Sequence, residues 1–160
     1  MEQFEQTRYR LPNSVFINEN GSFRDESAGS GADFQRPRAH RGAAFADFNG
    51  DGKIDVVVSS LGDPAELWEN ITETDGDWLI VKLEGVKANR DGIGARVKWG
   101  NQWNIMTSAV GYASSSYSGV HFGAPRTSAS DTLEILWPGG KSQVVTHVET
   151  RQILVVREEP

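Results

Sequence analysis

The sequence predicts an all-β protein made of short strands, and three observations lead to this class. Glycine occurs 17 times in 160 residues and is spread along the whole chain. No stretch longer than about ten residues keeps the 3.6-residue apolar period of an amphipathic helix. Short runs rich in Val, Ile and Phe are instead separated by turn signals at intervals of roughly 8–12 residues. This pattern is typical of an antiparallel sandwich or barrel.

The first expected element is a hairpin over residues 15–23. Val15 and Ile17 precede Asn20-Gly21, which is the strongest short-range signal for a two-residue hairpin turn, and Phe23 follows it. Residues 27–33, rich in Gly and Ser, are expected to form a flexible loop.

Two further strands are expected at residues 42–48 and 53–60, on either side of an acidic loop. Residues 63–70 (DPAELWEN) are the only stretch with helical character, and they predict one or two helical turns. The polar, turn-rich residues 69–77 then indicate a boundary. We therefore expect one segment over residues 10–70 and a second over residues 75–160.

The second segment has enough amphipathic strands to form a sandwich of its own. Residues 77–86 alternate apolar and polar side chains, as a half-buried strand does. Residues 131–145 predict a hairpin around a Pro-Gly-Gly turn. Single strands are expected at residues 94–100, 103–110, 120–124 and 150–159.

Composition excludes several classes of function. The net charge of −6 and the isoelectric point near 5.1 argue against a nucleic-acid partner, which would require a basic patch. The sequence has no apolar run long enough to span a membrane, and its polar first residues are not those of a signal peptide. Since it has no cysteine, disulfides and thiolate zinc sites are excluded.

The acidic loop over residues 47–55 carries oxygen-bearing side chains at alternate positions. A hard cation such as Ca²⁺ takes six to eight oxygen ligands, and alternate residues of a tight loop can direct oxygens to one point. The sequence therefore predicts a calcium site. Its predicted ligands are the side chains of Asp47, Asn49, Asp51 and Asp55 and the main-chain carbonyl of Lys53.

A plain turn is the alternative, because Asp, Asn and Gly are also the usual turn residues. A turn needs fewer oxygen donors, however, and three neighbouring carboxylates would repel one another without a cation. The loop is not an EF-hand: Val58 stands where the bidentate glutamate would be, and strands are expected on both sides. Gly52 permits the sharp turn at the sixth loop position.

Residues 42–60 (GAAFADFNGDGKIDVVVSS) resemble the FG-GAP (VCBS-type) repeat of β-propellers. Three later motifs, Asn89–Trp99, Gly111–Gly123 and Leu133–Val145, resemble the ASPIC/UnbV domain that follows such repeats in the cartilage acidic protein 1-like family. The resemblance implies a partial propeller blade with a calcium loop, followed by a β-sandwich. Only about one repeat is present, whereas a propeller needs about four to eight blades.

The histidines, serines and glycine-rich segment of the sequence do not form a recognisable catalytic motif. His121 lies near Ser114, Ser115, Ser116 and Ser118, but no G-x-S-x-G elbow or placed acid accompanies them. His40 and His147 lack zinc spacing. Residues 89–96 (NRDGIGAR) lack the lysine and helix of a phosphate loop, and they predict a turn held by Asn89, Arg90 and Asp91.

The five tryptophans raise the possibility of carbohydrate binding, since exposed indoles can stack on sugar rings. The candidate ligand surface comprises Trp99, Trp103 and Tyr112. The alternative is that the tryptophans are core residues. Under that alternative the core holds Trp68, Trp78 and Trp137, together with either Trp99 or Trp103.

From the residues and the resemblance we expect a non-enzymatic, calcium-stabilised binding or adhesion module, part of a larger secreted or cell-surface protein. An extracellular or periplasmic location is expected. Its partner would be a protein or glycan, with no nucleic acid and no membrane insertion, and exposed strand edges could form a homo-oligomer. The resemblance also leaves open an accessory protein or enzyme of enediyne-type natural-product biosynthesis. A carbohydrate-binding module is the third alternative.

Overall fold

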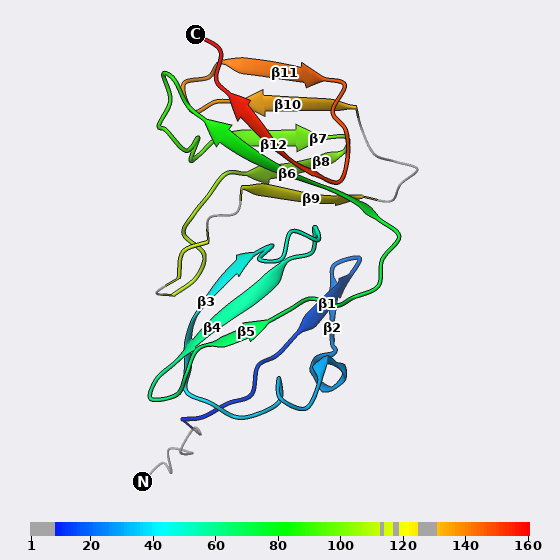
Figure 1. The fold of residues 1–160 in the computed structure, drawn as a ribbon, viewed down its shortest axis with the longest axis vertical. Coiled ribbons are helices and arrows are strands. Elements are labelled where there is room, and N and C mark those ends of the chain that lie inside the picture. Colours follow the sequence, from blue (N-terminus) through cyan, green and yellow to red (C-terminus); the bar gives the residue numbers. More distant parts are fainter. Residues whose placement is uncertain (1–8, 113, 117–118, 125–130) are drawn as a thin grey trace. The chain divides into compact units, whose positions relative to one another are not determined.

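The computed structural model describes residues 9–112, 114–116, 119–124 and 131–160, and these residues confirm the all-β class (Figure 1). They form twelve strands and one short 3-10 turn, with no α-helix among them. No helix in this described part is long and apolar enough to cross a membrane. The chain divides into two compact units, Met1–Gly42 with Val58–Glu66 and Ala43–Val57 with Leu67–Pro160.

The predicted hairpin is confirmed in the first unit. Strands β1 (Phe16–Glu19) and β2 (Ser22–Asp25) pair antiparallel. Asn20 and Gly21 both have positive φ, 54° and 93°, as the tight two-residue turn between right-twisted strands requires. Part of the loop expected at residues 27–33 is ordered as a 3-10 turn, η1 (Ser27–Ser30).

A three-stranded sheet has the order β3-β4-β5, with β3 at His40–Ala46, β4 at Asp55–Ser60 and β5 at Glu66–Trp68. The helical turns predicted at residues 63–70 are therefore wrong. The Glu66 carboxylate is 2.8 Å from Arg38 Nε and 3.0 Å from His40 Nε2, and these long-range contacts hold the segment extended. Pairing across the sheet overrides the weak local helical preference.

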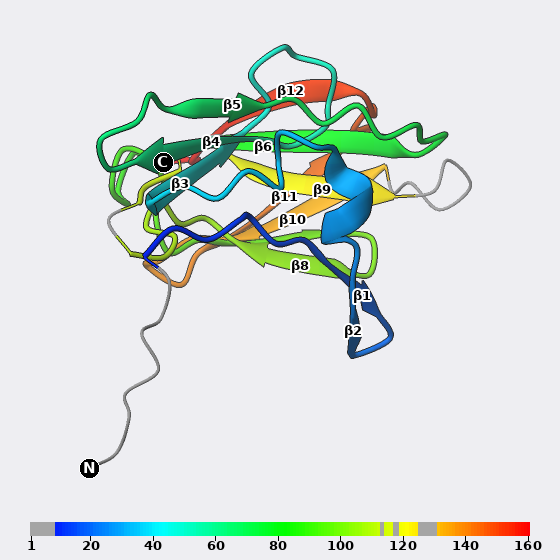
Figure 2. The ribbon, with the colours of Figure 1, turned by 90° about the horizontal axis from the view of Figure 1, so that it is seen from below.

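The second unit contains a sandwich of two sheets, which Figure 2 shows in a second view. One sheet has the order β11-β10-β7-β8 and the other β12-β6-β9. Pairing is antiparallel except between β12 and β6, which run parallel and depart from the all-antiparallel expectation. The strands are β6 (Asp77–Glu84), β7 (Arg96–Trp99), β8 (Gln102–Ile105), β9 (Val120–Ala124), β10 (Thr132–Leu136), β11 (Ser142–Thr146) and β12 (Gln152–Arg157).

The core lies between these two sheets. Leu79, Val81 and Leu83 of β6 face it, as their alternation predicts, and each is at most 2% exposed. Trp99 of one sheet and Phe122 of the other meet with ring centroids 6.0 Å apart at a tilted angle. Burial of these large apolar side chains supplies the main stabilisation of the sandwich.

Side-chain amides bridge both open sides of the sandwich. On one side, Gln102 and Asn104 of β8 donate to the carbonyls of Gly123 and His121 in β9. On the other, Gln143 of β11 donates to the carbonyl of Arg157, at the end of β12. These bonds satisfy edge groups that would otherwise face solvent unpaired.

The turn predicted at residues 89–96 is confirmed. The Asn89 side chain closes it with two 2.8 Å bonds, one from Ile93 N and one to Ile93 O. Arg90 and Asp91 form an adjacent ion pair at 3.0 Å. Gly92 has a φ of 63° and lies against Leu83, so a Cβ there would collide with the core.

Glu158 fixes the loop after β6 to the strand end after β12. Its Oε2 accepts hydrogen bonds from the amides of Val86, Lys87 and Ala88, each at 2.8 Å. The amide of Ala88 contributes most to holding the pKa of Glu158 below its ordinary value; the two other amides and the positive charge of Lys141 act in the same direction, against the effect of burial. The ionised carboxylate is therefore the form that stabilises the fold.

We predict that Glu158→Gln lowers the urea midpoint at neutral pH, because a neutral amide oxygen accepts these hydrogen bonds more weakly than a carboxylate. The lowered pKa means that the stabilisation is full above the ordinary carboxyl pKa and is lost as the pH falls through the lowered value. Urea unfolding across this range should show the difference between wild type and variant shrinking toward acid.

Glu159→Gln is the matched control, because Glu159 is the exposed neighbour of Glu158. It should leave the midpoint unchanged at every pH. A Glu158→Gln difference that stays constant down to acid pH would contradict the role of the charge.

Candidate functional site

The acidic loop between β3 and β4 is organised by Asp47. Its Oδ1 accepts the amides of Gly50 and Asp51 at 2.7 and 3.1 Å, and its Oδ2 accepts the amide of Gly52 at 2.9 Å. Gly50 and Gly52 have φ values of 79° and 87°, which favour glycine. Asp47 thus folds the loop around its own carboxylate.

Asn49 and Asp51 lie on the exposed side of the loop. Asn49 Oδ1 accepts the amide of Asp51 at 3.1 Å, and its Nδ2 donates to Glu69. Asp51 accepts the amide of Lys53 at 2.9 Å and lies 3.1 Å from the Lys53 ammonium. The hydrogen bond from the main-chain amide of Lys53 is the main cause that lowers the pKa of Asp51. This carboxyl group is therefore ionised at neutral pH, as a cation ligand must be.

Asp55, the first residue of β4, is 2% exposed. Its Oδ2 accepts the amide of Phe48 at 2.9 Å and its Oδ1 the amide of Asn70 at 2.8 Å. A buried carboxylate is tolerated because both oxygens are hydrogen-bonded. Asp55 therefore ties the loop to the segment that follows β5.

The donor chemistry of the loop fits a hard cation, since every predicted ligand is an oxygen. In the structure, the loop is held by hydrogen bonds from its own main-chain amides. In the described part of the chain, no three His, Cys, Asp or Glu side chains lie close enough together to hold a metal ion. The structure brings Asp47, Asn49 and Asp51 together around the loop amides, with the Lys53 carbonyl in the same loop, and buries Asp55 against Phe48 and Asn70. Calcium ligation by these residues remains a prediction.

Gly52, in the middle of the loop, is held by two residues of the sandwich. A Cβ at this position would overlap the pyrrole part of the Trp78 indole, so the ring lies directly against the glycine. His121 of β9 lies with Nε2 2.8 Å from the Gly52 carbonyl. Because a carbonyl only accepts, Nε2 donates and therefore carries the proton.

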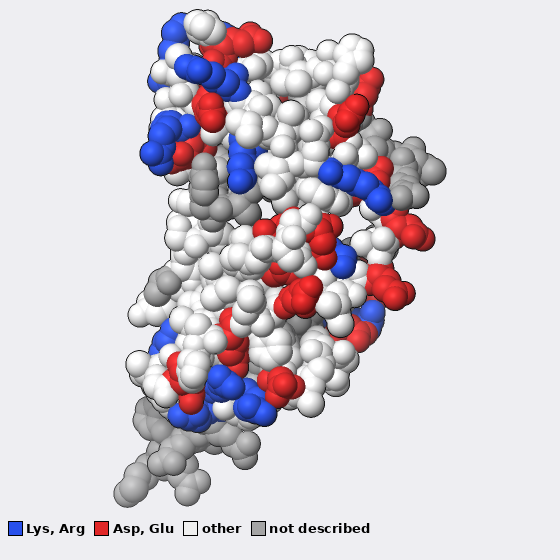
Figure 3. Space-filling model, viewed as in Figure 1, with Lys and Arg blue, Asp and Glu red and all other residues white. Residues whose placement is uncertain are grey.

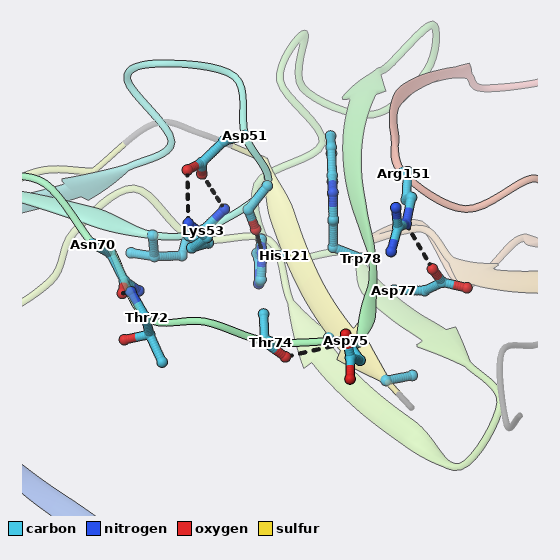
Figure 4. A pocket seen from close by; sticks show the side chains of 15 residues that line it. Asp51, Lys53, Asn70, Thr72, Thr74, Asp75, Asp77, Trp78, His121 and Arg151 are labelled. Carbon is cyan, nitrogen blue, oxygen red and sulfur yellow. Dashed lines mark hydrogen bonds and ion pairs between the residues drawn. The ribbon is translucent and has the colours of Figure 1, made fainter. Parts of the chain in front are cut away.

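A hollow of about 1030 Å³ lies beside this contact, inside the second unit (Figure 4). Its wall includes Trp78, His121, and the ion pair of Asp77 with Arg151 at 2.8 Å. In the view of Figure 4 the Trp78 ring stands between His121 and this ion pair. The polar segment after β5 also lines the hollow, through Asn70, Thr72 and Thr74.

The three residues of the predicted ligand surface lie in different environments. Trp99 is 1% exposed and belongs to the core, so it cannot share an exposed face with Trp103. Trp103 is 51% exposed on β8, with the guanidinium of Arg96 4.9 Å from its ring centroid. Tyr112 is 81% exposed. Ligand binding by Trp103 and Tyr112 remains a prediction.

The serines near His121 have a structural use. Ser114 Oγ and Ser116 Oγ accept the amides of Ala43 and Phe45 in β3, both at 2.9 Å. They thereby satisfy alternate amides of that strand. Ser118 lies outside the described residues.

Trp78 was not predicted as a site residue, because the sequence named it only among the tryptophans expected in the core. Trp78 is half-buried and lines the hollow, whereas Trp99 and Trp137 are the two tryptophans in the core. Strand alternation gave the available signal: Trp78 precedes Leu79 and therefore faces away from the sandwich core.

We predict that Gly52→Ala destabilises the protein by more than Gly50→Ala. Both glycines have positive φ, which costs alanine of the order of 1 kcal/mol. Only Gly52 also meets the Trp78 indole; nothing lies within 4 Å of a Cβ at Gly50. Urea unfolding of the two variants measures the difference, and equal losses would contradict the Trp78 contact.

Comparison with known proteins agrees with the two resemblances. Residues 7–58 match the family model of the FG-GAP-like repeat, and residues 85–160 match that of ASPIC and UnbV. Cartilage acidic protein 1 of Xenopus tropicalis is 32% identical over 108 residues, 62% of this chain and 16% of the relative. The Homo sapiens protein of that name is 32% identical over 128 residues, 72% of this chain and 19% of the relative.

The Mus musculus protein of the same name is 46% identical over 59 residues, 36% of this chain and 9% of the relative. The chain thus spans less than a fifth of the length of these curated relatives. The predicted resemblance is confirmed, and in the predicted order: this chain carries an FG-GAP-like repeat followed by an ASPIC and UnbV segment.

Proposed function

We propose that this chain is a non-enzymatic binding module, stabilised by Ca²⁺, within a larger secreted or cell-surface protein. One observation carries the proposal: the oxygen-rich loop is held against the sandwich at Gly52, by Trp78 packing and by the hydrogen bond from His121. A cation that orders the loop therefore also orders one wall of the hollow. The match to an FG-GAP-like repeat supports the same loop assignment.

The proposed ligands are side-chain oxygens of the loop acids and Asn49, with the Lys53 carbonyl. A bound Ca²⁺ would neutralise carboxylates that repel one another, and it would supply no chemistry beyond that. The Lys53 ammonium partly neutralises Asp51 in the structure. Because Asp47 and Asp55 each accept loop amides, they support the loop fold as well as the proposed site.

The proposed location is extracellular. Calcium sites of extracellular modules commonly have dissociation constants of about 10⁻⁴–10⁻³ M, which suits a millimolar compartment. Among the described side chains on the face in Figure 3, acidic and basic groups are interspersed without an extended basic patch. This distribution favours a protein or glycan partner over a nucleic acid.

We predict that Ca²⁺ raises the melting temperature of the wild type relative to EDTA, and that Asp51→Asn largely abolishes the rise. At a free concentration about a hundredfold above the dissociation constant, stabilisation by mass action is about 2.7 kcal/mol. For a chain of this size that corresponds to a shift of several degrees. Differential scanning calorimetry with a calcium titration measures it.

Asp51 is the informative position, because its carboxylate accepts one main-chain amide of the loop, that of Lys53, whereas Asp47 accepts three. Asp33→Asn is the matched control, since Asp33 is an exposed acid that forms an ion pair with Arg36 outside the loop. It should keep the full calcium shift. A wild type that melts at the same temperature with Ca²⁺ and EDTA would overturn the metal assignment.

A further inference from the structure

The hollow beside Gly52 combines one aromatic wall with a wall of neutral polar groups. Asn70, Thr72 and Thr74 line it, whereas Ile71 and Glu73 between them do not. This alternation indicates an extended segment that presents every second side chain to the hollow. Amide and hydroxyl groups both donate and accept, so this wall can bind groups that do the same, such as sugar hydroxyls.

The positive charges in the wall are paired with negative ones. Both cationic side chains that line it are paired with carboxylates, Lys53 with Asp51 at 3.1 Å and Arg151 with Asp77 at 2.8 Å. Asp75 adds a further negative charge. An anionic ligand would have to compete with carboxylates for both cations, so the wall disfavours an anionic ligand.

Trp78 supplies the apolar surface. Its pyrrole part rests on Gly52, and the half-buried ring also lines the hollow. An indole presents a flat apolar face together with a polar N–H, which suits a ligand with one apolar face and polar edges. The C–H face and equatorial hydroxyls of a pyranose ring have this character.

Arg151 is held beside Trp78 in an unusual conformation. Its φ is 58°, in the left-handed region that a non-glycine residue rarely adopts. Its amide donates to the Trp78 carbonyl at 2.7 Å, and its guanidinium reaches Asp77. Strained residues concentrate at ligand sites, where the strain positions a side chain. Here it places a fork of N–H donors, backed by a carboxylate, next to the aromatic ring.

We propose that this hollow binds a neutral saccharide. The sugar ring stacks on Trp78, while Asn70, Thr72 and the Asp77–Arg151 pair bind its hydroxyls. The volume of about 1030 Å³ lies at the upper end of the range for small-molecule sites and accommodates more than one sugar ring. This inference deepens the proposed binding function and rests on it, since it assumes a module that binds without catalysis.

The test is titration of the whole chain with four neutral disaccharides: cellobiose, maltose, lactose and di-N-acetylchitobiose. Binding is followed by calorimetry and indole fluorescence. We expect at least one to bind with a dissociation constant of about 10⁻³ M. Inorganic phosphate and putrescine serve as anionic and cationic probes, and neither should bind as tightly. Failure of all four disaccharides, or tighter binding of either charged probe, overturns the proposal.

Variants locate the site. Thr72→Val removes one hydroxyl at an exposed position and should weaken binding about threefold to tenfold, and Arg151→Ala about tenfold. Trp78→Ala should abolish binding, but it also removes the Gly52 contact, so the two milder variants carry the test if it fails to fold. Phe23→Ala, which removes an exposed aromatic ring outside the hollow, is the matched control and should bind like wild type, while Trp103→Ala tests the ligand surface predicted from the sequence. Wild-type affinity in both Thr72→Val and Arg151→Ala, or a loss confined to Trp103→Ala, contradicts this site.

Every titration is run with Ca²⁺ and with EDTA, beside the melting curves of the same samples. Saccharide binding without a calcium shift supports the hollow and removes only the metal from the proposed function. A calcium shift without saccharide binding overturns only the ligand.

Discussion

Carboxylates that accept main-chain amides hold the irregular parts of this protein. Asp47 and Glu158 each accept three amides, and Asp55 accepts two. Short strands joined by long turns leave many amides without a ladder partner, and a buried amide without an acceptor is costly. A carboxylate with two oxygens can satisfy several amides at once, and the bonds are strong because the acceptor is charged. The loops therefore depend on side chains, while the sandwich depends on its core.

The acidic loop joins these two kinds of structure. Its shape comes from Asp47 and Asp55, and its position in the second unit comes from Gly52, which Trp78 and His121 hold. Gly52 thus answers two requirements, a left-handed turn and a close approach by an indole. A substitution at this one residue would disturb both the loop and the wall of the hollow, because the same atoms belong to each.

Local elements were predictable, and long-range ones were not. The hairpin at Asn20-Gly21 and the turn closed by Asn89 follow from turn chemistry between residues close in sequence. Strand β5 does not, because Glu66 is held extended by Arg38 and His40, more than twenty residues earlier. The spacing of oxygen donors in the loop was likewise readable, but the contacts of Asp55 with Asn70 and of Gly52 with Trp78 exist only after folding. The hollow could therefore not be found from sequence.

The shared wall has a thermodynamic consequence. Asp51, Gly52 and Lys53 line the hollow and also belong to the loop proposed to hold Ca²⁺. If the cation favours one arrangement of this wall and the saccharide favours the same arrangement, each must raise the affinity of the other by an equal factor. The linkage requires no conformational change in the sandwich, because the loop alone can supply the two states. Trp78 is the residue through which the coupling would pass, since it packs on Gly52 and faces the hollow.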